Sequence, residues 1–219
     1  MKVGTDGVLL GAWACPHTEQ PLPMKCLDIG TGTGLIALML AQRFPTASIT
    51  GIDIDDASIE QAKENVEASP FKERILIKKQ DFNIINLHSN KYELIVSNPP
   101  FYKEETLGGK QARDAARHTT SLPFNTLVEN ASKMLSENGV FSVIIPYAEA
   151  PSFISICAFN KLYLHRRLDV RSSERKPFKR TLLEFGKTLF PAQTDTLTLQ
   201  DTHNSRTAEY AQLTGAFYI

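Results

Sequence analysis

Asn98, Pro99, Pro100 and Phe101 follow a strand-like run at residues 94–97 and combine groups that suit chemistry on an amine conjugated to a ring or carbonyl. Such a nitrogen is a poor nucleophile because its lone pair is delocalised. Two fixed acceptors, the Asn98 side-chain oxygen and the Pro99 carbonyl, can each accept one N–H hydrogen bond and favour a tetrahedral, attacking nitrogen. The prolines keep the turn rigid, and Phe101 can stack on the ring. A tight turn that only ends a strand is the alternative interpretation.

The elements that must position this turn alternate between strand-like and helix-like segments from about residue 25. This alternation predicts an α/β fold, with a mainly parallel seven-stranded sheet and helices on both faces. The expected strands are residues 25–29, 48–52, 75–79, 92–96, 140–145, 163–170 and 181–186, and the expected helices are residues 35–40, 57–68, 122–135, 153–159 and 207–213. The Asn98 turn therefore falls at the carboxyl end of the fourth strand, the edge at which open α/β sheets bind ligands.

The bulk composition restricts the class of protein. With 219 residues and 42% apolar content, the chain can bury a substantial core, and we expect one domain over residues 1–219. The 24 basic and 24 acidic residues balance, so composition alone does not indicate a nucleic-acid binder. Three widely spaced cysteines favour neither disulfides nor a zinc site, and neither a membrane span nor a signal peptide is visible. We expect a soluble, cytoplasmic monomer that needs no metal.

A glycine-rich turn at residues 27–34 follows the first expected strand and opens the first expected helix. Glycines at such a place let the backbone approach a nucleotide ligand closely. The spacing of Gly30, Gly32 and Gly34 is GxGxG. A dinucleotide fingerprint requires a glycine where Leu35 stands, so pyrophosphate binding fits poorly.

Acidic residues stand in or after each of the first three expected strands. Asp28 lies in the glycine turn, and Asp53 ends the second strand, where a carboxylate can accept hydrogen bonds from two ribose hydroxyls. Asp81, followed by Phe82, comes after the third strand, where an acid can accept from an adenine amino group while an apolar neighbour covers the ring. Taken singly, each acid has an alternative role: Asp28 as a turn cap, Asp53 and Asp55 as helix N-caps, and Asp81 as a solvated loop acid. Their joint occurrence in this order favours the cofactor-binding interpretation.

Together these segments resemble the class I S-adenosylmethionine-dependent methyltransferases over residues 25–146, which implies a Rossmann-like fold and S-adenosylmethionine as the cofactor. The resemblance implies that Asp28 orients the methionyl end of the cofactor, that Asp53 holds the ribose and that Asp81 contacts the adenine amine. The cofactor-binding residues that it implies within this range are Asp28, Gly30, Gly32, Gly34, Asp53, Ile54, Asp81, Phe82 and Asn98.

In that family, an Asn-Pro-Pro-Phe turn after the fourth strand is the signature of enzymes that methylate planar exocyclic amines or amides. The catalytic residues implied here are Asn98, Pro99 and Phe101. Adenine N6, guanine N2 and the glutamine side chain remain open as targets. Protein glutamine methyltransferases of this type carry a sizeable helical domain before the first strand, whereas this chain has 24 residues there, which weakens the protein-substrate option.

Both ends of the chain are similar to one tRNA-modifying family. Residues 1–13 closely resemble the start of the catalytic domain in the bacterial valine-tRNA adenosine methyltransferases, which modify N6 of the purine just 3′ of the anticodon, and residues 181–185 and 207–218 resemble that family's tail. The resemblance implies that residues 1–24, including Thr5 and Asp6, close the cofactor pocket. A Gly-rich turn leading into a core helix is the alternative. Relatives usually have an additional strand before this segment, which is compatible with a longer parent sequence.

A basic stretch toward the end of the chain suits phosphate contacts that weaken as salt rises. Its residues, which give a local charge of plus five against Asp169 and Glu174, are Arg166, Arg167, Arg171, Arg175, Lys176, Lys179 and Arg180. A charged hairpin facing solvent is the alternative interpretation. Residues 102–121 are polar and predict either a lid over the site or a disordered loop, and Arg113 and Arg117 within them are further candidates for RNA contacts.

These observations lead to one functional hypothesis, S-adenosylmethionine-dependent N6-methylation of an adenosine in tRNA, at position 37 of the anticodon loop of a valine tRNA. The nearest alternatives are methylation of guanine N2 in ribosomal RNA, of adenine N6 in DNA or of protein glutamine. A nicotinamide-dependent dehydrogenase is opposed by the glycine spacing and by the Asn98 turn. A non-catalytic RNA-binding domain that retains the fold is the remaining alternative.

Overall fold

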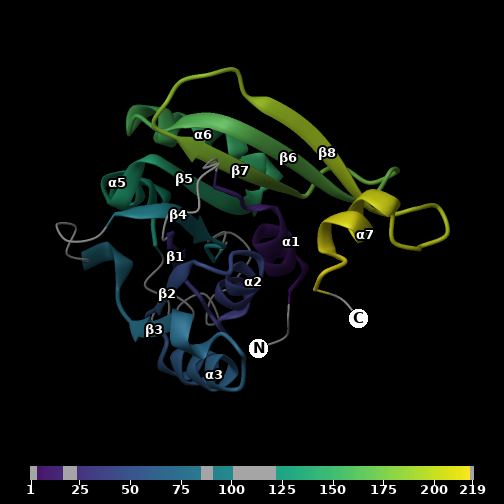
Figure 1. Cartoon of the computed structure of the whole chain (residues 1–219). Coiled ribbons are helices and arrows are strands. Elements are labelled where there is room, and N and C mark those ends of the chain that lie inside the picture. The colour runs from purple at the N-terminus through teal and green to yellow at the C-terminus, as the bar shows by residue number, and fades with distance from the viewer. Residues whose placement is uncertain (1–3, 17–23, 85–90, 101–121, 218–219) are drawn as a thin grey trace, which may run out of the picture.

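The computed structural model describes residues 4–16, 24–84, 91–100 and 122–217. Its strands are β1 (Lys25–Ile29), β2 (Ser48–Asp53), β3 (Ile75–Lys79), β4 (Tyr92–Ser97), β5 (Leu135–Pro146), β6 (Tyr163–Ser173), β7 (Arg180–Gly186) and β8 (Gln193–Gln200). In these described ranges, eight strands form one sheet in the order β3-β2-β1-β4-β5-β7-β6-β8 (Figure 1). The strands from β3 to β5 are parallel, β7 is antiparallel to β5 and β6, and β8 is parallel to β6.

Helices cover both faces of the sheet, as the alternating pattern predicts (Figure 1). They are α1 (Thr5–Trp13), α2 (Leu35–Arg43), α3 (Asp56–Glu67), α5 (Phe124–Met134), α6 (Ala150–Phe159) and α7 (Ala208–Thr214). One core cluster lies between the sheet and α1, α2, α3 and α7, and a second lies between the sheet and α5 and α6. The Rossmann-like α/β fold is therefore confirmed.

The central strands are apolar on both sides because both faces of the sheet are covered. In β4, Leu94, Ile95 and Val96 are fully buried. Leu94 and Val96 belong to the cluster beneath α1 and α2, whereas Ile95 belongs to the cluster beneath α5 and α6, as the strand alternation requires. This double packing fixes the end of β4, and with it the position of Asn98.

All seven predicted strands are present, and an eighth, β8, was missed. Its sequence is rich in threonine, and of its side chains only Leu197 is buried. Such a strand at the edge of a sheet depends on its ladder with β6 more than on an apolar face, so the apolar alternation that marks the other strands is weak here. β5 begins at Leu135 instead of residue 140, because Leu135 pairs with Tyr92 across an irregular register.

The N-terminal segment forms a helix, α1, that packs against α2. A Cβ atom at Gly11 would lie 2.7 Å from the Met39 sulfur, and one at Gly7 would lie 3.2 Å from Leu35 Cδ2. These glycines therefore allow the close approach of the two helices. The helix begins at Thr5, so Thr5 and Asp6 lie in its first turn.

Some predictions fall outside the described residues. These are Phe101, the candidate lid at residues 102–121, and Arg113 and Arg117 within it. In the described part of the chain, no helix is long and apolar enough to cross a membrane.

Candidate active site

The candidate site lies where neighbouring parallel strands end. β1 is flanked by β2 and β4, with Ile29 level with Ile52 on one side and Ser97 on the other. The crossover therefore brings the glycine turn after β1 between Asp53, at the end of β2, and Asn98, directly after β4. These predicted residues follow adjacent strand ends, as expected for a ligand site in an open α/β sheet.

The glycine turn has a backbone conformation that requires glycine. Gly30, Gly32 and Gly34 have φ values of 70°, 55° and 80°, in the left-handed region that other residues rarely adopt. The N–H groups of Gly30 and Thr31 both donate to the Ile52 carbonyl at 2.9 Å, which fixes the turn to β2. A Cβ atom at Gly30 would meet nothing within 4 Å. Space next to Gly30 is therefore open to a ligand.

A residue on α3 also holds this turn. The Asn65 side-chain amide donates to the Thr33 carbonyl at 2.9 Å. Gly34, which precedes α2, lies against the same helix, with its Cβ position 3.4 Å from Ala62 Cβ. Sequence reasoning missed Asn65, since it lies inside an amphipathic helix where an asparagine gives no signal of its distant partner.

Asp28 is fully buried in β1. Thr31 Oγ1 donates to Asp28 Oδ2 at 2.6 Å, while Oδ1 has no hydrogen-bond partner among the described residues. Burial raises the pKa of Asp28 to about 7, and the charge of Asp53 adds to this effect. The Thr31 hydroxyl and the Ala37 N–H, in the first turn of α2, act in the opposite direction. A buried carboxyl with an unmet oxygen is suited to a cationic partner, because a nearby positive charge favours the ionised form.

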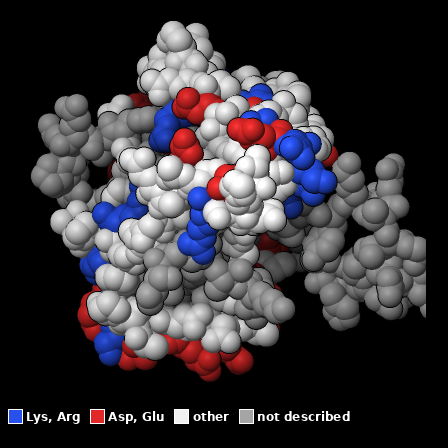
Figure 2. Space-filling view, turned by 90° about the vertical axis from the view of Figure 1, so that its right-hand side faces the viewer, with Lys and Arg blue, Asp and Glu red and all other residues white. Residues whose placement is uncertain are grey.

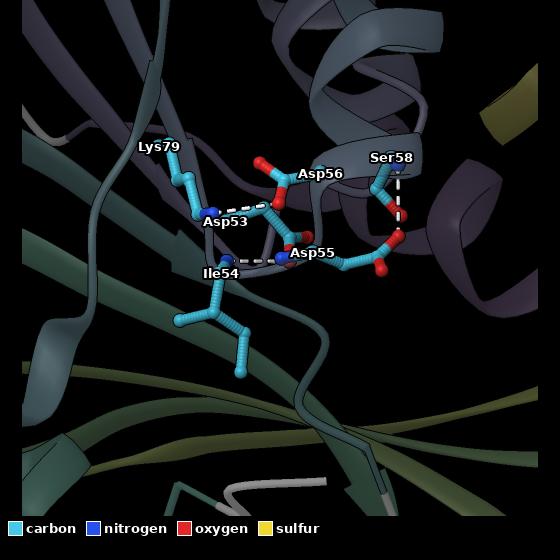
Figure 3. A network of polar contacts seen from close by, with 6 residues as sticks. All are labelled: Asp53, Ile54, Asp55, Asp56, Ser58 and Lys79. Atoms are coloured by element: carbon cyan, nitrogen blue, oxygen red, sulfur yellow. Dashed lines mark hydrogen bonds and ion pairs between the residues drawn. The ribbon is translucent and has the colours of Figure 1, made fainter. Parts of the chain in front are cut away.

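The structure separates the roles of the acidic residues after β2. Asp55 accepts from the Ser58 N–H at 2.8 Å and is the N-cap of α3, and Asp56 pairs with Lys79 at 2.7 Å (Figure 3). Asp53 is therefore not the helix cap that its sequence position allowed.

The Asp53 carboxylate is instead bound to backbone around the glycine turn. Its Oδ2 accepts from the Gly32 N–H at 2.9 Å, and its Oδ1 accepts from the N–H groups of Ile54 and Asp55 at 2.7 and 3.1 Å. A carboxylate offers about four acceptor positions, so about one remains for a ligand hydroxyl. Ribose binding through both hydroxyls would require one of the backbone bonds to open.

Asp81 and Phe82 occupy the turn after β3. Asp81 Oδ1 accepts from the backbone and side-chain N–H groups of Asn83 at 2.8 and 2.9 Å. Phe82 is 3% exposed and packs in the core cluster beneath α5, and its carbonyl accepts from the Asn130 side chain at 2.8 Å. Asp81 is thus held by its own turn, and the backbone of Phe82 is anchored to α5.

The end of β4 is tied to the end of β1. Ser97 is 1% exposed, and its hydroxyl donates to the Ile29 carbonyl at 3.0 Å. The next residue, Asn98, is half-buried, Pro99 is buried and Pro100 is exposed. Ser97, like Thr31, was missed from the sequence. The available signals are a hydroxyl residue at the end of β4 for Ser97 and one within the glycine turn for Thr31.

The first turn of α1 is joined to the carboxyl edge of the sheet. Arg180 Nε donates to Asp6 Oδ2 at 2.7 Å. In the sheet, Arg180 at the start of β7 stands opposite Pro146, the last residue of β5. Asp6 was predicted to bind the cofactor and Arg180 to bind RNA. The hydrogen bond between them shows that these two residues lie together in the structure. Thr5 is exposed beside Asp6.

The basic stretch does not form one continuous patch, because strand alternation divides it. Arg166 lies on the α1 face, 4.4 Å above the Trp13 ring and 3.3 Å from the buried Glu184. Arg167 lies on the opposite face and donates to Asp169 at 2.8 Å. The remaining described members are Arg171 on β6, the exposed Arg175, Lys176 and Lys179 between β6 and β7, and Arg180. On the face in Figure 2, basic and acidic side chains are interspersed over the upper part, and acidic side chains gather along the lower edge.

Comparisons with known proteins agree with this geometry. The methyltransferase small domain family matches residues 15–153. The tRNA1(Val) (adenine(37)-N6)-methyltransferase of Flavobacterium psychrophilum is 41% identical over 100% of this chain and 93% of the relative, and the enzyme of the same name from Porphyromonas gingivalis is 42% identical over 100% and 89%. A solved structure from Agrobacterium tumefaciens, described as a predicted O-methyltransferase, shares the fold, with a TM-score of 0.74, 18% identity and 96% coverage of both chains. The chain belongs to the tRNA1(Val) (adenine(37)-N6)-methyltransferase family, and its cofactor is S-adenosylmethionine.

Proposed function

We propose that this protein transfers a methyl group from S-adenosylmethionine to N6 of adenosine 37 in the anticodon loop of a valine tRNA. The observation that carries the proposal is the position of Asn98, a half-buried amide directly after β4, beside the glycine turn that follows β1. Relatives that carry the name of this activity are 41% and 42% identical over the whole chain, which supports the choice of substrate.

The residues of the site fit the cofactor. Asp28 Oδ1 is a buried acceptor without a partner in the described part of the chain, and the space beside Gly30 is open. An ammonium group of the cofactor, placed against Asp28, would supply the missing partner of Oδ1. The open space beside Gly30 would let the cofactor approach the backbone closely. When bound, S-adenosylmethionine supplies a methyl group on a positively charged sulfur. The residues proposed to hold it are Thr5, Asp6, Asp28, Gly30, Gly32, Gly34, Asp53, Ile54, Asp81, Phe82 and Asn98.

Asn98 and Pro99 orient the amine. The Asn98 side-chain oxygen and the Pro99 carbonyl each accept one N–H hydrogen bond, so the nitrogen lone pair points away from both acceptors, toward the methyl group. Ser97, anchored to Ile29, prevents the turn from shifting. The nitrogen forms a bond to the methyl carbon as the carbon–sulfur bond breaks, and the cationic amine then loses its proton to water.

The target base must leave its stack to reach Asn98. Extrusion costs a few kcal/mol and less in a loop than in a duplex. Phe101, which lies outside the described residues, is proposed to stack on the base and return about 1 to 3 kcal/mol. The exposed Arg175, Lys176 and Lys179, with Arg113 and Arg117, are proposed to contact phosphates.

The assembly is also a proposal. All eight described strands lie in one sheet, which supports a single methyltransferase domain over residues 1–219. We place the protein in the cytoplasm as a monomer with tRNA as its partner, and light scattering in the presence and absence of tRNA measures its oligomeric state.

The decisive experiment incubates the protein with methyl-labelled S-adenosylmethionine and unmodified tRNA transcripts, followed by digestion and mass spectrometry of the nucleosides. We expect label in N6-methyladenosine from a valine tRNA. Label in N2-methylguanosine, in DNA or in protein glutamine would replace the proposed substrate by the corresponding alternative.

Asn98→Ala tests the assignment of the catalytic amide. We expect it to abolish transfer while cofactor affinity, measured by calorimetry, stays nearly unchanged, because Asn98 acts mainly on the amine. Asn160→Ala, after α6, removes an asparagine whose side chain donates to the Ile156 carbonyl of the preceding helix, and is the matched control. A large loss of cofactor binding in Asn98→Ala would contradict the assignment.

A further inference from the structure

Two aromatic rings and two arginines gather on the surface beyond the carboxyl end of β5. The rings of Tyr147 and Phe178 have centroids 5.5 Å apart and are tilted by 31°. The guanidinium carbon of Arg167 lies 5.3 Å from the centre of the Tyr147 ring, and that of Arg171 lies 5.4 Å from the centre of the Phe178 ring. We call these four side chains the aromatic platform.

The backbone beneath the aromatic platform is tied together. Tyr147 begins a short 3-10 helix (Tyr147–Glu149), and its N–H donates to the Lys179 carbonyl at 3.1 Å. The Lys179 N–H in turn donates to the Val170 carbonyl at 2.9 Å. Tyr147 and Phe178, 31 positions apart in the sequence, are therefore presented by one hydrogen-bonded unit.

The arginines are also held in place. Arg167 Nε donates to Asp169 at 2.8 Å, and Arg171 Nε donates to Thr198 Oγ1 at 2.9 Å. Planar guanidinium groups fixed in this way are suited to stacking as well as to charge. Tyr147 nonetheless remains 36% exposed, and Phe178 is half-buried. Part of the aromatic area of this pair is therefore accessible at the surface.

The aromatic platform lies near the candidate active site. Val143 of β5 is level with Ser97 of β4. From this register, three further residues of extended chain place Tyr147 roughly 10 Å beyond the level of Asn98 along the strand direction, and about 5 Å to the side. A nucleotide next to the one whose base reaches Asn98 can therefore reach Tyr147.

We propose that the aromatic platform stacks an unpaired nucleobase of the RNA loop adjacent to the target adenosine. Unpaired bases are recognised chiefly by stacking on aromatic side chains and guanidinium planes, and the exposed cations that follow Ser173 supply charge for the neighbouring phosphates. The inference rests on the proposed function, since it assumes that the substrate presents a single-stranded loop. It adds a subsite that distinguishes a loop from a duplex.

The experiment uses an anticodon stem–loop RNA with 2-aminopurine in the loop next to the target adenosine, because stacking quenches the fluorescence of this base. We expect the full-length protein to quench it on binding. Tyr147→Leu and Phe178→Leu keep apolar bulk but remove a ring, and each should weaken binding about tenfold, equivalent to 1.4 kcal/mol. Tyr147→Phe should bind within about twofold of the unchanged protein, because the ring is what the base contacts.

Three further measurements separate stacking from other roles. The salt dependence of binding should not change in the leucine variants, because no charge is removed. A blunt RNA duplex should bind them as it binds the unchanged protein. Phe159→Leu, which alters an aromatic residue that is 90% exposed at the end of α6, is the matched control and should have no effect.

Failure of this inference is distinguishable from failure of the proposed function. If the unchanged protein methylates the stem–loop but the leucine variants bind and quench normally, the aromatic platform is rejected and the function stands. A lower melting temperature with unchanged RNA affinity, or equal losses for loop and duplex, also rejects it, in favour of a packing role. If the unchanged protein methylates no adenosine in the stem–loop or the full tRNA, the proposed function itself fails.

Discussion

Thr31→Val tests whether the ionised form of the buried Asp28 carboxyl binds the cofactor. The substitution keeps the size and branching of the side chain but removes the hydroxyl that donates to Asp28 Oδ2 at 2.6 Å. This hydrogen bond favours the charged form, so its loss should raise the pKa of Asp28 above its value of about 7. Hydrogen bonds to charged groups contribute about 1.5 to 3 kcal/mol, which is roughly a tenfold to hundredfold change in the protonation equilibrium.

The sign of the pH dependence follows from this pKa. Asp28 ionises as the pH rises through about 7, and a cationic ligand prefers the ionised form, so its contribution to affinity grows over this range. With the smaller, tenfold change, the affinity ratio of the unchanged protein to Thr31→Val should be about tenfold at pH 6, about fivefold at pH 7 and about twofold at pH 8. Both proteins bind the same ligand, so any effect of pH on the ligand's own protonation cancels in this affinity ratio.

Calorimetric titration with S-adenosylmethionine at these three pH values measures the ratio. Thr33→Val is the control, because it makes the same change two residues further along the turn, and Thr33 is not among the described residues that act on Asp28. We expect the affinity ratio of the unchanged protein to Thr33→Val to be close to one and constant with pH. A Thr31→Val ratio that is also constant with pH would refute the argument, since it would show that the protonation of Asp28 does not control binding.

The remaining predictions concern packing and charge. Gly11→Ala should destabilise the protein by about 1 to 3 kcal/mol, because its new Cβ would lie 2.7 Å from the Met39 sulfur. Gly4→Ala, whose Cβ position has no neighbour within 4 Å, should lower the melting temperature less, because at the N-cap of α1 it changes only the capping preference. Lys176→Gln should lower the salt slope of tRNA binding by about one. Arg166→Gln should leave the slope unchanged, because Arg166 already pairs with Glu184. Equal slopes for both variants would contradict the distinction between cations that contact RNA and cations that are paired within the protein.

Much of the fold could be predicted from the sequence because its signals are local. The apolar runs of β1 and β4 and the amphipathic face of α3 each lie within a dozen residues. Their order predicts parallel crossovers, and parallel crossovers bring the carboxyl ends of the strands to one edge. The approximate positions of Asp53 and Asn98 were therefore predictable. β8 was missed because its pairing with β6, not its own apolar pattern, makes it a strand.

What the tertiary structure alone decided depends on groups that are distant in the sequence. Counting charges could not show that Arg166 and Arg167 face opposite sides of the sheet, or that Arg180 pairs with Asp6 from 174 positions away. Asp53 and Asp55 were equivalent candidates for the helix cap until the backbone geometry assigned it to Asp55. The pKa of Asp28 is set by burial, which exists only in the folded chain. The sequence therefore determined which chemical groups are available and on which strand ends they lie, while packing determined which of them are already paired and which remain open to a ligand.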